Sequence, residues 1–152
     1  MLLEGQLGIG EMAVRLNVVM IQNPPAAVGG QHLAESTIGE VIGQPGIDLL
    51  LVNSLAEIDR RSTDFLSLES LQSDVAVLGW EQQASIAELW NGLGLVGTRS
   101  RHRYDPDADV ARSDRRLFAF NLTQFRDGKA VCTALKQLPQ PNGKGLCLLG
   151  LE

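Results

Sequence analysis

The sequence predicts a single-domain α/β protein with a three-layer, mixed β-sheet, in which a parallel β-α-β first half is followed by an antiparallel meander. Short aliphatic runs alternate with amphipathic helical patterns as far as residue 94, and strand-like runs without intervening helices follow. No repeat, low-complexity tract or linker interrupts the 152 residues. Residues 1–152 are therefore assigned to one domain, with residues 1–10 as a flexible N-terminal segment.

The first expected strand covers residues 12–21, which are rich in aliphatic and β-branched side chains and lead into a Pro-Pro pair. Residues 32–43 carry apolar side chains at helical spacing and end at a glycine, which predicts a helix. Residues 47–53 form a nearly continuous aliphatic run. Such a run is typical of a strand that is buried on both faces of a parallel sheet.

The same alternation continues through the middle of the chain. Residues 63–72 predict a short helix and residues 74–80 a third strand. Residues 81–94 have the clearest helical pattern, with a buried stripe that includes Ile86 and Trp90. We expect the three strands of this first half to be neighbours in one sheet.

The second half is expected to be the antiparallel meander. Its strands are assigned to residues 95–104, 115–125, 129–138 and 144–151. The dipeptides Asp127-Gly128 and Asn142-Gly143 are typical of hairpin turns between such strands. Cys132 and Cys147 would then lie on adjacent strands, where free buried thiols are favoured over a disulfide.

Composition limits the classes of function. Apolar residues make up 44% and charged residues 20%, as in globular proteins, and the net charge of −5 argues against a protein that mainly grips a nucleic-acid backbone. The N-terminus has no basic region ahead of an apolar run, and no apolar run is long enough to span a bilayer. The expectation is a cytoplasmic protein without membrane contact.

Two motifs resemble ligand sites but lack an essential part of each. Residues 92–97 read G-x-G-x-x-G, yet they follow a predicted helix and precede a predicted strand, the reverse of a dinucleotide site, so a helix end is the better interpretation. Residues 105–109 resemble the start of a calcium loop, but Val110 and Arg116 stand where it needs glycine and glutamate. We therefore expect neither a cofactor nor a metal.

Residues 98–116 hold six of the ten arginines together with four aspartates. On a strand, Arg99, Arg101 and Arg103 would share one face, which predicts a solvated row beside an exposed loop. Interleaved acids and bases favour a loop with scattered ion pairs. The alternative is a docking patch for a partner protein or a small anionic ligand, with these three arginines as the contact residues.

A ligand pocket in an α/β sheet is expected beyond the carboxyl ends of the parallel strands. The residues that follow the three predicted strands are Asn23, Gly29, Gly30, Asn53, Ser54, Trp80 and Glu81. A glycine pair between a strand and a helix suits either an anion site or a tight turn. Glu57, Asp59 and Glu81 are candidate acid/base groups if the chain is an enzyme.

Two functions of different classes follow from these observations. The preferred hypothesis is a non-enzymatic binding or protein-interaction module, in which oligomers are possible through an edge strand. The alternative is an enzyme domain that binds a small molecule or anion at the carboxyl ends of the strands. The sequence itself identifies neither the ligand nor the partner.

Overall fold

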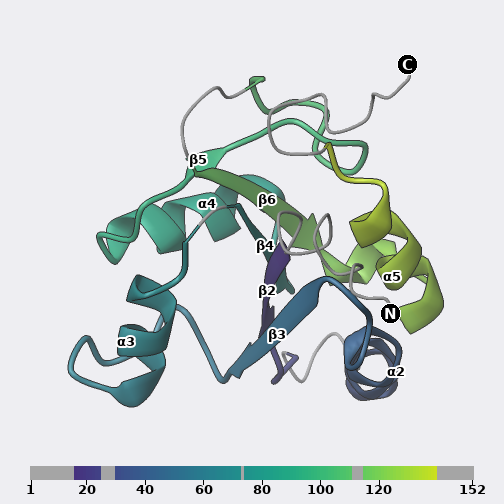
Figure 1. Ribbon diagram of the computed structural model, residues 1–152, viewed down its shortest axis with the longest axis horizontal. Helices are drawn as coiled ribbons and strands as arrows, with labels where there is room; N and C mark the ends of the chain where they lie inside the picture. Colours follow the sequence, from purple (N-terminus) through teal and green to yellow (C-terminus); the bar gives the residue numbers. More distant parts are fainter. Residues whose placement is uncertain (1–15, 25–29, 73, 111–114, 140–152) are drawn as a thin grey trace, which may run out of the picture.

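The computed structural model describes residues 16–24, 30–72, 74–110 and 115–139. Their strands form one five-stranded sheet in the order β3-β2-β4-β6-β5, and each neighbouring pair is parallel (Figure 1). The strands are β2 (Leu16–Ile21), β3 (Ile47–Val52), β4 (Val75–Gly79), β5 (Thr98–Arg99) and β6 (Arg116–Asn121).

Helices cover both faces of this sheet. They are α2 (Gln31–Val41), α3 (Thr63–Glu69), α4 (Gln83–Gly92) and α5 (Gly128–Lys136), and a 3₁₀ turn, η1 (Leu122–Gln124), follows β6. Figure 1 shows α3 and α4 on one side of the sheet and α2 and α5 on the other. The predicted three-layer α/β arrangement is confirmed in this respect, and none of the helices in the described part is long and apolar enough to cross a membrane.

The predicted strand neighbours of the first half agree with the structure. The prediction that residues 47–53 form a strand buried on both faces is wrong, because β3 lies at the edge of the sheet and most of its residues are partly exposed. Strands β3, β2 and β4 are adjacent, with β2 in the middle, as expected from their aliphatic runs. All five residues of β4 are buried, because helices cover the strand on both faces of the sheet. That burial explains why its sequence is apolar at every position instead of alternating.

The predicted antiparallel meander is wrong. Strand β6 pairs in parallel with both β4 and β5, and residues 129–138 lie mainly in helix α5 instead of a strand. Five of the six residues of β6 are buried, so β6 is a central parallel strand. The remaining predicted strand, at 144–151, the turn at 142–143 and the N-terminal segment 1–10 lie outside the described residues.

Helix α5 begins where the sequence suggested a hairpin. The carboxylate of Asp127 accepts a hydrogen bond from the amide of Ala130 at 2.9 Å and so caps the helix. Gly128 lies against α2, where an added Cβ would approach the Ser36 carbonyl oxygen to 2.2 Å. The dipeptide therefore marks a helix start and a close helix–helix contact. Cys132 is a buried free thiol on this helix, whereas Cys147 is outside the described residues.

Candidate functional site

The carboxyl ends of β2 and β3 bring two of the predicted site residues together. The side-chain oxygen of Asn53 accepts hydrogen bonds from the amide groups of Gln22, at 2.8 Å, and Asn23, at 3.2 Å. Both asparagines are exposed. Their amides satisfy one another at the surface, as expected for polar groups that follow adjacent parallel strands.

The crevice between β2 and β4, where the strand order reverses, is occupied by Trp80. Its ring is only 6% exposed, and its indole N–H donates to the Ile21 carbonyl oxygen at 2.8 Å. The ring packs so closely on Gly30 that a Cβ at that position would lie 2.6 Å from it. Trp80 and Gly30 therefore fill this part of the carboxyl edge, and the glycine makes room for the ring.

The other predicted residues of this edge have local partners. The Ser54 hydroxyl accepts from the Glu57 amide at 3.2 Å, and the exposed Glu81 accepts from the Trp80 amide at 3.3 Å. Asp59 accepts from the Arg61 amide at 2.9 Å. None of Glu57, Asp59 and Glu81 lines either of the two pockets described below, and Gly29 lies outside the described residues.

The arginine row is divided by its surroundings. Ser100 and His102 are buried while Arg101 and Arg103 are exposed, so the predicted alternation extends beyond the two-residue strand β5. The prediction that Arg99 is solvated is wrong. Its guanidinium forms a two-point ion pair with Asp105, with distances of 2.9 and 2.7 Å.

This ion pair is partly removed from water. The side chain of Arg99 is 30% exposed and that of Asp105 only 3%. The hydrogen bonds to Asp105 raise the pKa of Arg99 above its ordinary value, although desolvation opposes the shift. Because the guanidinium of Arg99 and the carboxylate of Asp105 hold each other in place through two hydrogen bonds, this ion pair forms a rigid part of a site.

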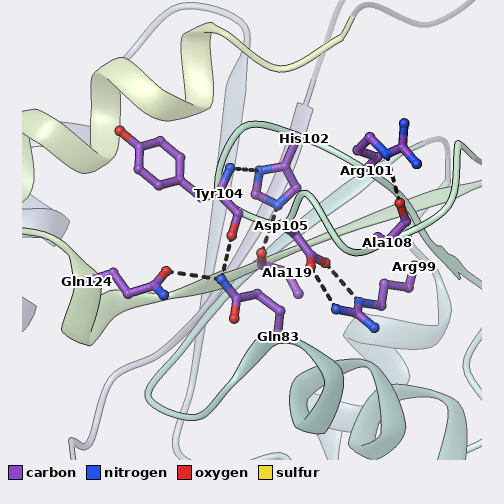
Figure 2. Close-up of polar contacts among 9 residues, drawn as sticks. All are labelled: Gln83, Arg99, Arg101, His102, Tyr104, Asp105, Ala108, Ala119 and Gln124. Atoms are coloured by element: carbon purple, nitrogen blue, oxygen red, sulfur yellow. Dashed lines mark hydrogen bonds and ion pairs between the residues drawn. The ribbon is translucent and has the colours of Figure 1, made fainter.

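The loop after β5 is anchored to the sheet through His102. One ring nitrogen, Nε2, lies 2.8 Å from the Ala119 carbonyl oxygen, and the other, Nδ1, accepts from the Tyr104 amide at 3.2 Å (Figure 2). The ring also packs 4.4 Å from that of Phe120. Burial lowers the pKa of His102, because charging the ring would require desolvating a cation. The neutral imidazole of His102 thus holds this loop against the sheet.

A pocket of about 580 Å³ lies beyond the carboxyl ends of β4, β6 and β5. We call it the α4 pocket, because the first turn of α4 forms one of its walls. Its lining consists of Gln82, Gln83, Ala84, Arg99, Tyr104, Asp105, Pro106, Asp107, Asn121 and Gln124. These residues come from α4, β5, the following loop, β6 and η1. The volume of the pocket and its mixed polar and apolar lining suit a small ligand.

Figure 2 shows how one wall of the α4 pocket is held. The side-chain NH₂ of Gln83 donates to the Tyr104 carbonyl oxygen and, at 3.0 Å, to the side-chain oxygen of Gln124. Helix α4 begins without a side-chain cap, and its first residues, Gln82, Gln83 and Ala84, line the same pocket. The wall is therefore ordered before any ligand arrives.

Sequence reasoning missed Asn121 and its neighbours in the pocket. Asn121 follows the apolar run of β6 as Asn53 follows that of β3. The rule that placed Asn53 at a strand end applies equally to Asn121 once β6 is recognised as parallel. The signal was present, but the antiparallel assignment of residues 115–125 concealed it.

A second depression, which we call the arginine groove, has a volume of about 460 Å³. It is lined by Ser100, Arg101, His102, Arg103, Pro106, Val110, Arg116 and Pro139. Val110 is 65% exposed beside it. Neither this groove nor the α4 pocket is lined by the residues that the sequence placed at the ends of β2 and β3.

The glycine motif at residues 92–97 has a plain structural role. Helix α4 ends at Gly92, Gly94 has a φ of +84°, and β5 starts at Thr98, so the glycines end a helix as interpreted. Within the described ranges no group of three or more histidine, cysteine or acidic side chains is placed to hold a metal ion.

Fold and site together define a parallel α/β domain with a preformed polar pocket at the carboxyl edge of its sheet. Comparisons with protein-family models, curated proteins and solved structures found no match for the chain.

Proposed function

We propose that the chain is a binding domain that takes a small polar ligand in the α4 pocket. The observation that carries this proposal is the convergence of polar side chains from separate elements on a pocket of about 580 Å³ at the carboxyl edge of a parallel sheet. Ligands of α/β proteins bind at this edge, outside the strand ends. Arg99, Gln83 and Asn121 provide groups that orient a ligand without any rearrangement of the fold.

A thermal-shift screen with sugars, nucleosides, amino acids and organic acids tests the proposal. A compound that binds only the native state raises the melting temperature in proportion to its occupancy. Ala84 lines the pocket and is exposed, so Ala84→Trp places a large ring in it. Ser85, the next residue of α4, is exposed but does not line the pocket, and Ser85→Trp is the matched control.

The expected result is at least one compound whose stabilisation is lost in Ala84→Trp and kept in Ser85→Trp. Stabilisation that survives in both variants would place the binding site elsewhere. A screen in which no compound raises the melting temperature would contradict the proposal.

A second candidate function is the docking of an acidic, apolar peptide segment of a partner protein in the arginine groove. Arg101 and Arg103 are exposed at this groove, and Val110 adds apolar surface. Charge complementarity would attract glutamate or aspartate side chains, and the attraction would weaken with salt.

Fluorescence anisotropy with a labelled peptide of alternating glutamate and leucine tests this second function. We expect binding at low salt that the double variant Arg101→Ser/Arg103→Ser abolishes. A peptide of alternating lysine and leucine is the control. Equal binding of both peptides would show that the charges of the groove play no part.

A further inference from the structure

The chemical class of the ligand can be deduced from the hydrogen-bonding groups of the α4 pocket. Asn121 is the most buried amide side chain in it, at 9% exposure. Its side-chain oxygen accepts from the Thr123 amide at 3.1 Å and from the Thr123 hydroxyl at 2.6 Å, which fixes the orientation of the amide. The NH₂ group of Asn121 has no hydrogen-bond partner among the described residues. This NH₂ group is not among the buried atoms that lack a partner, so it is accessible to solvent and can donate to a ligand in the pocket.

The glutamine pair adds a donor and an acceptor. Gln83 uses its NH₂ group for the Tyr104 carbonyl and the oxygen of Gln124. Within the described part of the chain, the side-chain oxygen of Gln83 and the NH₂ group of Gln124 have no hydrogen-bond partner and are available to a ligand. The pocket therefore presents free donors and free acceptors side by side.

The charges of the pocket do not favour an anion. The guanidinium of Arg99 is already neutralised by Asp105 through two hydrogen bonds. Asp107 adds a second carboxylate to the lining. The first turn of α4 supplies only a partial positive charge. An anionic ligand would meet two carboxylates and a single, already paired cation.

From these groups we infer that the ligand is a neutral molecule with several hydroxyl groups, such as a sugar, a conclusion that rests on the proposed binding function of the pocket. A hydroxyl both donates and accepts, so each one can pair with a free donor and a free acceptor of the wall. Asn121 donates to a ligand oxygen, while Asp107 and the oxygen of Gln83 accept from ligand hydroxyls. The inferred uncharged ligand thus replaces the small anionic ligand that the sequence offered as an alternative.

The test is an NMR titration of the ¹⁵N-labelled protein with D-glucose, D-ribose and maltose, and separately with inorganic phosphate and putrescine. The side-chain NH₂ signals of Asn121 and Gln124 report directly on the pocket. We expect saturable shifts with at least one sugar and none with phosphate or putrescine.

Two matched variants complete the experiment. Asn121→Asp keeps the oxygen that accepts from Thr123 but removes the NH₂ donor, and we expect at least a tenfold loss of sugar affinity. Asn53→Asp makes the same change where the side-chain oxygen also accepts two hydrogen bonds, outside the pocket, and should leave sugar affinity unchanged. Saturable shifts with phosphate or putrescine but no sugar would overturn the inferred class and leave the binding function standing. No saturable shift with any probe would overturn both.

Discussion

The carboxyl edge of the sheet holds two places where strand order departs from chain order, and they differ in what occupies them. Between β2 and β4, Trp80 lies on Gly30 and donates to the Ile21 carbonyl, so the space is filled by the protein itself. Beyond β4, β6 and β5, the side chains of Gln83, Arg99 and Asn121 line an open pocket.

This difference shows that topology and side chains play separate roles in forming a site. The parallel arrangement places loop residues near one another at both positions. A single large ring, admitted by the absence of a side chain at Gly30, closes the first position. Paired polar groups, which satisfy one another and so stay in place, keep the second position open.

Replacing the ring tests the comparison most severely. Trp80→Ala should lower the free energy of unfolding by about 4 kcal/mol, because it empties a buried site and leaves the Ile21 carbonyl without its donor. Chemical denaturation measures this loss. Trp80→Phe keeps an aromatic ring in the site but loses the hydrogen bond and part of the packing, so it should cost clearly less than Trp80→Ala. Equal costs for the two variants would mean that packing contributes little at this edge.

The wall of the open pocket should depend on one arginine of the row and not on its neighbour. Arg99→Ser leaves the Asp105 carboxylate, which is 3% exposed, without its counter-ion and should cost about 3 kcal/mol, the low end for buried pairs because Arg99 keeps some contact with water. Arg103 is exposed, with its guanidinium 5.6 Å from the Tyr104 ring, so Arg103→Ser should cost less than about 1 kcal/mol. Melting curves of the two variants beside wild type check this. Similar losses would refute the division of the row.

Substitutions at the C-terminal end of α4, away from the pocket, separate an effect on stability from an effect on ligand binding. Gly94 has a φ of +84°, so Gly94→Ala should cost about 1–2 kcal/mol from backbone strain alone. Gly92 is the last helical residue with open space around its Cα, and Gly92→Ala should not destabilise the protein. Neither change should alter ligand binding in the α4 pocket, and a binding loss in Gly94→Ala would show that the pocket depends on global stability.

The smallest effect concerns pH and the loop after β5, which carries His102 and Asp105. Burial lowers the pKa of His102 below its ordinary 6.5, although the Ala119 carbonyl and Asp105 oppose the shift. Between the lowered pKa and 6.5 the unfolded chain holds a proton that the folded chain does not. Stability should therefore be complete above pH 6.5 and decline as the pH falls toward the folded-state pKa.

Urea unfolding across this pH range measures the effect, with His102→Gln as the comparison. The variant should show a flatter dependence on pH, whatever its stability at neutral pH. An unchanged slope would mean that His102 does not titrate differently in the folded protein.

Local sequence was sufficient for much of the fold. The run at residues 74–80 is apolar at nearly every position, and the strand β4 within it is buried at every residue because it is covered on both faces. The similar run at residues 47–53 forms β3, which lies at the edge of the sheet and is only partly buried. The strand-end rule also placed Asn23 and Asn53 beside one another. Where a whole segment is buried, as in β4, burial leaves its mark on each residue of that segment.

The direction of the later strands depended on contacts that no local pattern contains. Asp127-Gly128 suits a hairpin turn as well as a helix start, and the choice is made by Ser36, 92 residues away, whose hydroxyl accepts from the Gly128 amide. Residues 129–138, which an antiparallel meander would have needed as a strand, instead lie mainly in α5 and pack on α2. Backbone preference near a turn amounts to a few tenths to about 1 kcal/mol, whereas burying a helix face contributes several times more.

The sequence by itself thus determined the α/β class, the first three strands and the edge of the sheet at which polar side chains gather. Only the tertiary structure decided which place on that edge is filled by Trp80, that Arg99 is held by Asp105, and that Thr123 orients the amide of Asn121 in the pocket. The physical reason is that hydrophobic periodicity is a property of neighbours along the chain. Cavities, ion pairs and unsatisfied donors are properties of neighbours in space.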